Sequence, residues 1–202
     1  MKVIGITGGV GAGKSEILAY LREHANCRII IADRVAHELE RQGEVCYEQI
    51  VALLGREIVA EDGEIDKSKM AARIFADREL LAQINEIVHP AVKKHIVGEI
   101  EKERKAGRLE YLFIEAALLI EDGYNEIVDE MWYIRTDEKI RRDRLKASRG
   151  YSDEKIDSIM REQLSEEEFY RHCSTVIDNS KTLEGAYGQI EKKLGERLCQ
   201  KQ

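Results

Sequence analysis

The sequence predicts an α/β fold built on a parallel sheet of five strands. Strand-like and helical segments alternate along the chain, as is typical of parallel sheets whose strands are joined by helices. A glycine-rich segment, residues 8–15, lies between the first apolar run and the first helical pattern. Thr7, Asp33 and Glu115 each stand at or just past the end of a predicted strand. Open parallel sheets bind ligands at the carboxyl ends of their strands, so a site is expected there.

Five short apolar runs are the predicted strands, at residues 3–6, 28–31, 110–115, 131–134 and 175–178. The predicted helices after the second strand cover residues 34–42, 44–56, 67–76 and 77–106, and an amphipathic helix from Leu183 to Leu198 follows the last strand. Pro90 falls inside the long helical segment. Because proline lacks a backbone donor and clashes with the preceding turn, we expect this helix to break or kink near His89.

The length of 202 residues predicts one domain with a substantial core. Residues 44–106 and 137–172 are helical in pattern and lack strand-like runs. We therefore expect the first of these segments to form a cap and the second a lid. The remaining segments, residues 1–43, 107–136 and 173–202, are expected to form the core.

The segment Gly8–Ser15 fits the phosphate-loop pattern G-x-x-x-x-G-K-[ST]. Glycines allow backbone N–H groups to turn inward around a phosphate chain, and the following helix presents its N-terminal N–H groups and positive dipole end to the same anion. Lys14 is expected to reach the β- and γ-phosphates, and the Ser15 hydroxyl to bind Mg²⁺. The motif predicts binding of a nucleoside triphosphate.

Composition argues against several other classes of protein. The net charge of −7 does not favour a nucleic-acid-binding surface. No apolar run approaches the ~20 residues of a membrane span, and no basic and apolar leader segment opens the chain. The histidines show no metal-binding spacing, and the cysteines form no C-x-x-C pair. A cytoplasmic protein with reduced thiols is expected. The cysteines are Cys27, Cys46, Cys173 and Cys199.

Two further features favour a kinase over a GTPase switch. The N-K-x-D motif by which Ras-type GTPases bind their base is absent from the sequence. Residues 139–149 are rich in arginine and follow the fourth strand, as expected of a lid that closes over phosphates, although a solvated basic helix face would have the same composition. Asp33 begins a helix after the second strand, where it could be a helix cap or a general base.

The order of motifs along the chain resembles the dephospho-coenzyme A kinase family. The resemblance covers nearly the whole chain. The matching segments are Thr7–Ser15, Ala32-Asp33, Asp62–Lys67, His89-Pro90, Ala117–Glu121, Arg144–Gln163 and Ile177–Asn179. Ile31, Ala117 and Glu16 stand where the family pattern has Asp, Pro and Thr, and Arg144 and Arg149 are five residues apart instead of four.

This resemblance implies a three-layer P-loop kinase-like fold with a helical substrate cap and lid. It also implies ATP-dependent phosphorylation of the ribose 3′-hydroxyl of dephospho-coenzyme A, with Mg²⁺ as cofactor. The residues that it implies in catalysis are Asp33 as general base, Lys14, Thr7, Arg144 and Arg149. Those that it implies in ATP binding are Gly9, Gly11, Ala12, Gly13, Lys14, Ser15, Glu16 and Arg142. Those implied in acceptor binding are Asp33, His89, Pro90, Leu118 and Leu119.

Two other functions stay open at this point. One is a kinase for another nucleoside monophosphate or a small alcohol, and the other is a nucleotide-dependent switch or binding module. The expected partners are ATP and dephospho-coenzyme A, without nucleic acid or membrane. The expected assembly is a monomer or a weak homo-oligomer.

Overall fold

The chain divides into two compact units. The sheet unit consists of Met1–Ile29 and Glu103–Gln202, and the helical unit of Ile30–Lys102. The computed structural model describes residues 1–195, and for residues 76 and 78 it describes the backbone alone. Leu198 and Cys199, which belong to the predicted last helix and the predicted free thiols, lie outside the described residues.

The five predicted strands are all present and form one sheet. Its order is β2-β3-β1-β4-β5, and the pairs β1–β3, β1–β4 and β4–β5 are parallel. The strand bounds are β1 Lys2–Thr7, β2 Cys27–Ile31, β3 Tyr111–Glu115, β4 Glu130–Arg135 and β5 Thr175–Asp178. The interiors of β1, β3 and β4 are apolar on both faces, as expected for strands in a parallel sheet that is covered on both sides. The predicted α/β class is confirmed.

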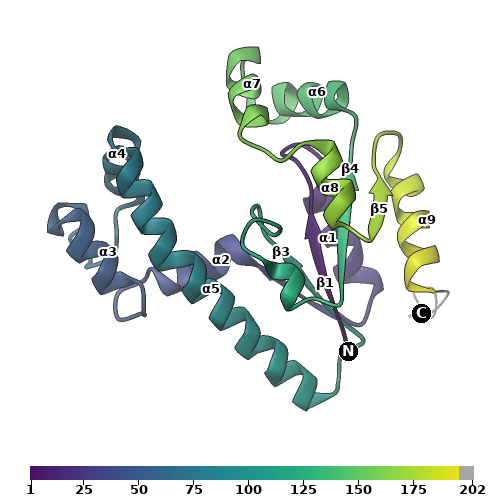
Figure 1. The fold of residues 1–202 in the computed structure, drawn as a ribbon, viewed down its shortest axis with the longest axis horizontal. Coiled ribbons are helices and arrows are strands. Elements are labelled where there is room, and N and C mark those ends of the chain that lie inside the picture. Colours follow the sequence, from purple (N-terminus) through teal and green to yellow (C-terminus); the bar gives the residue numbers. More distant parts are fainter. Residues whose placement is uncertain (196–202) are drawn as a thin grey trace. The chain divides into compact units, whose positions relative to one another are not determined.

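Helices cover both faces of the sheet within the sheet unit, and Figure 1 shows their connections. On one face, Ile17 and Leu21 of α1 (Lys14–His24) pack with Ile190 of α9 (Leu183–Leu194) against apolar strand residues. On the other face, Tyr133 of β4 stacks on Phe169 of α8 (Glu166–His172), with ring centroids 4.6 Å apart. These three layers place the core between strands and helices.

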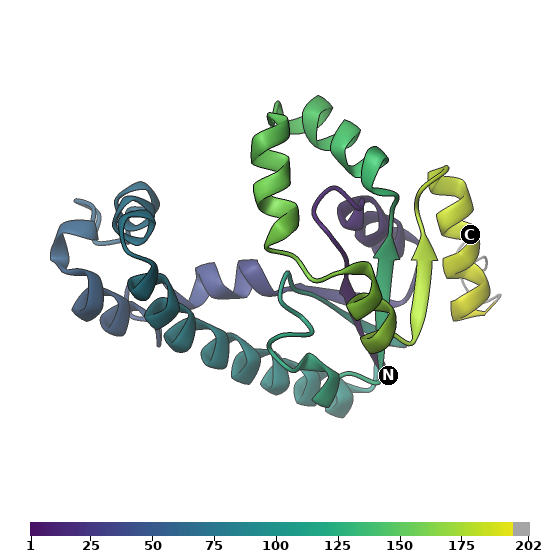
Figure 2. The same ribbon diagram turned by 45° about the horizontal axis from the view of Figure 1, so that its top comes forward.

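Two helices and a turn connect β4 to α8. They are α6 (Glu138–Arg149) and α7 (Asp153–Arg161). In Figure 2 these green helices lie beyond the arrowhead of β4, at the carboxyl end of the strand. A short 3-10 helix, Tyr124–Glu126, lies between β3 and β4.

The helical unit contains the predicted helices with modest changes in their bounds. They are α2 Ala32–Leu39, α3 Tyr47–Leu54, α4 Lys67–Ala76 and α5 Arg78–Ala106, with a 3-10 turn at Arg56–Ile58. The helix α3 ends earlier than predicted because Gly55 leaves the helical conformation, with φ at +90°. The Asp66 side chain begins α4 by accepting hydrogen bonds from the backbone of Ser68 and Lys69.

The predicted break at Pro90 is wrong, because α5 runs without interruption from Arg78 to Ala106. Proline removes one backbone donor from the helix, at a cost of about 3 kcal/mol in an isolated helix. Val88 and Val92, one on each side of Pro90, are both buried. Packing of these side chains offsets the local penalty, so the tertiary context overrides the intrinsic preference.

Two findings bear on the class of protein. Within residues 1–195, no helix combines the length and the apolar character needed to cross a membrane. Cys27, Cys46 and Cys173, the three cysteines in that range, are free thiols.

Ile17→Ala is expected to lower the free energy of unfolding by about 2–5 kcal/mol, because it leaves a cavity between α1 and the sheet where Ile17 is fully buried. Val45→Ala is the control, since Val45 is 59% exposed. Urea unfolding followed by circular dichroism measures both changes. Equal losses in the two variants would contradict the assignment of Ile17 to the core.

Candidate functional site

The glycine-rich segment forms a loop that joins β1 directly to α1. Gly11 and Gly13 have φ angles of +79° and +86°, in the left-handed region that favours glycine. Gly13 is the residue that caps α1, and it has no side chain with which to bond to the first turn of the helix. The N-terminal N–H groups and the positive end of the helix dipole therefore form a cradle for an anion.

Lys14 begins α1 and turns its side chain back over the loop. Its Nζ donates a hydrogen bond of 2.7 Å to the carbonyl oxygen of Gly8 and lies 3.6 Å from the Glu115 carboxylate. Both side chains are largely buried, and Glu115 is the last residue of β3. The position of Glu115 at a strand end was visible in the sequence, but its pairing with Lys14 required the strand order, which brings β3 beside β1.

The other predicted residues near this loop differ in their exposure. Thr7, the last residue of β1, is buried, whereas the side chains of Ser15 and Glu16 are exposed in the first turn of α1. An acidic residue in that turn is compatible with the helix dipole. No group of three or more His, Cys, Asp or Glu side chains gathers in a metal-binding cluster within the described part of the chain.

The arginines of α6 fall into two groups. Arg142, a predicted ATP-binding residue, pairs instead with carboxylates: its guanidinium lies 2.8 Å from Glu138 and 2.6 Å from Asp157. The exposed Arg149 side chain lies over the ring of Tyr151 at 5.8 Å. Arg144 contacts the loop, because it donates hydrogen bonds to the carbonyl oxygens of Ala12 and Asn179.

Arg141 also contacts the loop, and no part of the sequence analysis singled it out. Its Nε donates to the carbonyl of Val10 at 2.9 Å, and its Nη2 donates to Gln163 Oε1 at 2.6 Å. The same Gln163 oxygen accepts the backbone N–H of Val10 at 3.3 Å. The guanidinium lies so close to Gly9 that a Cβ there would be 2.3 Å from its central carbon.

Helical periodicity alone does not identify Arg141. Leu145 is the only residue of α6 that is buried among those described, so it marks the inward face of the helix. Positions 141 and 142 lie four and three residues before Leu145, about 40° and 60° from it on opposite sides. A helical wheel centred on Leu145 therefore places both arginines near the inward face and does not choose between them.

The charge of Arg141 has no carboxylate partner within ion-pair distance in the described part of the chain. Burial lowers the pKa of its guanidinium below the usual value, but arginine stays protonated in proteins. Glu138 and Glu166 attract this partly buried charge without forming an ion pair with it among the described contacts. A phosphate chain in the adjoining loop would add a negative charge beside the guanidinium.

The remaining predicted residues lie apart from the loop in the chain. In the sheet unit, Leu119 is fully buried and covers Gly5, whereas Leu118 is 38% exposed. In the helical unit, Asp33 is exposed in the first turn of α2, and it makes no side-chain cap there among the described hydrogen bonds. His89 and Pro90 lie within α5.

The family model described as dephospho-CoA kinase matches residues 2–185. A dephospho-CoA kinase from Carboxydothermus hydrogenoformans is 34% identical over 190 residues, which cover 94% of this chain and 91% of that protein. The corresponding protein from Aquifex aeolicus is 36% identical over 193 residues, 95% of each chain.

A solved structure titled dephospho-CoA kinase from Campylobacter jejuni shares the fold. Its TM-score is 0.72 at 19% identity, with 96% of each chain covered. At that identity the likeness concerns the fold alone. The α/β fold of this chain is therefore shared over nearly the whole length of the Campylobacter structure.

Arg141→Gln is expected to weaken binding of ATP by about tenfold to a hundredfold, because it removes a partly buried positive charge and its charge-assisted hydrogen bonds beside the loop. Isothermal titration calorimetry with MgATP measures the dissociation constant. Arg161→Gln is the matched control, since Arg161 is exposed on α7 and bonds only to the Asp157 carbonyl of its own helix. An equal effect in the control would show that overall charge, and not the contact with the loop, explains the loss.

Proposed function

Because this chain belongs to the dephospho-coenzyme A kinase family, we propose that it transfers the γ-phosphoryl group of ATP to the ribose 3′-hydroxyl of dephospho-coenzyme A, giving coenzyme A and ADP. The family match over residues 2–185 carries the proposal, because it includes the loop, Asp33 and the arginine-bearing helices together. The loop alone would support any protein that binds a nucleoside triphosphate.

On the donor side, the backbone of Gly9 and residues 11–16 would hold the triphosphate. Lys14 is held by the Gly8 carbonyl and Glu115, so its ammonium group is already drawn over the loop before a phosphate arrives. Arg144 and Arg149 would offset the charge of the transferring group, with Thr7 beside it. The contact of Arg144 with the Ala12 carbonyl supports the first of these arginines more directly than the second.

The exposed hydroxyl of Ser15 fits one ligand of a Mg²⁺ ion. Mg²⁺ prefers oxygen ligands and usually binds through one or two protein groups together with phosphate oxygens and water. Bound there, the ion would neutralise part of the charge on the β- and γ-phosphates. Ser15 lies in the first turn of α1, at the end of the helix that the loop joins.

On the acceptor side, Asp33 would orient the 3′-hydroxyl and accept its proton. Its carboxylate is exposed and bonds to no backbone N–H among those described, so the alternative role as a helix cap has no support. His89, Pro90, Leu118 and Leu119 stay predicted contacts of the acceptor. Leu118 is the more accessible of the two leucines, since Leu119 is fully buried.

The remaining sequence predictions are part of the same proposal. In this proposal, residues 1–43, 107–136 and 173–202 form the core, residues 44–106 the substrate cap and residues 137–172 the lid. The protein is proposed to act in the cytoplasm on ATP and dephospho-coenzyme A, as a monomer or a weak homo-oligomer.

The proposal predicts ADP release that depends on dephospho-coenzyme A. A coupled assay should detect turnover with this acceptor and none with coenzyme A, whose 3′-position already carries a phosphate. AMP and shikimate test the alternative acceptors. Phosphorus NMR of the product should locate the new phosphate at the 3′-oxygen. Preferred turnover of another acceptor would replace the proposed substrate, and nucleotide binding without turnover of any acceptor would favour the switch or binding module.

Asp33→Asn is expected to lower kcat by about 10²- to 10⁴-fold, because the amide cannot accept the hydroxyl proton. The affinity for ATP should change by less than about twofold, since a base on the acceptor contributes little to donor binding. Glu38→Gln is the control, an exposed acid on the same helix. Steady-state kinetics with both substrates varied measure the effect, and near-normal turnover would remove Asp33 from the role of base.

A further inference from the structure

The carbonyl oxygen of Ala12 accepts hydrogen bonds from three side chains. Asn179 Nδ2 donates at 2.8 Å, Thr136 Oγ1 lies at 3.0 Å, and Arg144 Nη1 donates at 3.3 Å. Ala12, Thr136 and Asn179 are all buried, and Asn179 is fully so. The single hydroxyl hydrogen of Thr136 is shared between Ala12 and the carbonyl of Arg135 at 2.9 Å. Three donors on one main-chain oxygen define a feature that we call the Ala12 clamp.

The sheet determines where the clamp residues emerge. Arg135 at the end of β4 is in register with Asp178 at the end of β5, so Thr136 and Asn179 leave adjacent strands side by side. The backbone N–H of Asn179 continues this ladder by donating to the Arg135 carbonyl at 2.8 Å. The position of both side chains is thus fixed by the strands and not by the loop that they contact.

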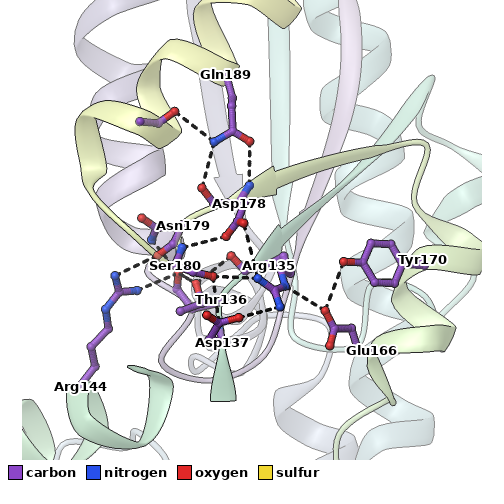
Figure 3. Close-up of polar contacts among 12 residues, drawn as sticks. Arg135, Thr136, Asp137, Arg144, Glu166, Tyr170, Asp178, Asn179, Ser180 and Gln189 are labelled. Carbon is purple, nitrogen blue, oxygen red and sulfur yellow. Dashed lines mark hydrogen bonds and ion pairs between the residues drawn. The ribbon is translucent and has the colours of Figure 1, made fainter. Parts of the chain in front are cut away.

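A network of ion pairs centred on Arg135 holds the same two strand ends, as Figure 3 shows. The guanidinium lies 2.6 Å from Asp137, 2.9 Å from Glu166 and 3.5 Å from Asp178. It also donates to the Ser180 hydroxyl at 3.1 Å. The hydrogen bond to Glu166 and the nearby acids raise the pKa of Arg135 above its usual value. This network braces residues on both sides of Thr136 and Asn179.

The clamp acts on the peptide that joins Ala12 to Gly13. In a trans peptide the C=O and N–H groups point in opposite directions, and no peptide in the described chain is cis. Fixing the carbonyl on Thr136 and Asn179 therefore turns the Gly13 N–H away from them. Among the described hydrogen bonds this N–H has no acceptor. It is available to an anion held by the loop.

Hydrogen bonds to a carbonyl also strengthen the N–H of the same peptide as a donor, because chains of hydrogen bonds polarise one another. Arg144 adds a positive charge to this effect. The close packing explains why residue 13 is glycine: besides its φ of +86°, a Cβ would lie 2.4 Å from Asn179 Nδ2. The Oδ1 atom of Asn179 is buried without a hydrogen-bond partner. An unpaired buried acceptor lowers the stability of the fold, so the Asn179 amide keeps its bond from Nδ2 to Ala12 at a cost in free energy.

We propose that Thr136 and Asn179, assisted by Arg144, are positioning residues that hold the Ala12–Gly13 peptide with its N–H directed at the phosphate chain. This inference rests on the proposed function, in which the loop holds the triphosphate. The clamp predicts a contribution to phosphate affinity that does not depend on the nucleotide base. It also gives Asn179 and Thr136 a role in the donor site although neither lies in the loop.

The test compares two buried threonines with the same substitution. Thr136→Val removes a hydroxyl that contacts Ala12, whereas Thr175→Val removes a buried hydroxyl that has no partner. Thr136→Val should raise the dissociation constants of ADP and of inorganic tripolyphosphate, both with Mg²⁺, by about fivefold to tenfold. Thr175→Val, and Thr136→Ser, which keeps the hydroxyl, should each stay within about twofold of the wild type.

Two outcomes would overturn the clamp: equal affinities in the two valine variants, or a loss for ADP without a loss for tripolyphosphate. Thermal unfolding without ligand separates loss of binding from loss of fold. If Thr136→Val does not fold, glycine-labelled wild-type protein provides the measurement. The Gly13 amide proton should move downfield when tripolyphosphate binds, and an unmoved signal would contradict the proposal. These binding tests contain no dephospho-coenzyme A. A lack of turnover in the ADP-release assay would therefore contradict the proposed function and leave the result on the Ala12 clamp unchanged.

Discussion

The path of the loop between Gly8 and Gly13 depends on backbone conformations that favour glycine. At Gly11 and Gly13 the requirement is one of torsion angle, since both have positive φ. At Gly9 the Arg141 guanidinium lies where a Cβ would be, so a larger residue there would require this side chain to move. The glycines therefore serve two purposes: they leave backbone N–H groups free on the side where an anion would bind, and they let α6 pack against the loop. A larger side chain at Gly9 would push Arg141 of α6 away from the loop.

Positive charge near the loop is distributed unevenly, although the protein is acidic as a whole. Arg142 pairs with Glu138 and Asp157, so its charge is compensated by acids of α6 and α7. Arg141 and Arg144 bond instead to uncharged oxygens of the loop and of neighbouring residues. The chain is thus acidic as a whole, while these two arginines and Lys14 bring basic side chains to the loop. This arrangement suits a ligand that carries several phosphates.

The ends of the strands provide the rigid frame for these groups. Thr7, Glu115, Thr136 and Asn179 all lie at or just past the carboxyl ends of four neighbouring strands. The hydrogen bonds between the strands fix the position of each of these residues, since none of them lies in the middle of a loop. The general rule that parallel sheets bind ligands at this edge is therefore realised here with one side chain from each of four strands. Loop glycines supply the backbone donors, and strand ends supply the side chains that hold them.

The sequence by itself determined those elements, and the phosphate-binding chemistry, that follow from a local pattern of residues. The five strands, the phosphate loop and the long helix follow from short-range periodicity and from glycine spacing, so they could be predicted. Choosing between Arg141 and Arg142, pairing Lys14 with Glu115, and bringing Asn179 to Ala12 depended on which segments the fold makes neighbours. Asn179 and Ala12 are 167 residues apart, and no local pattern connects them. Pro90 failed as a helix breaker for a similar reason, since burial of Val88 and Val92 outweighed a local preference. Tertiary structure decided these points because contact energies depend on proximity in space, which sequence spacing does not specify.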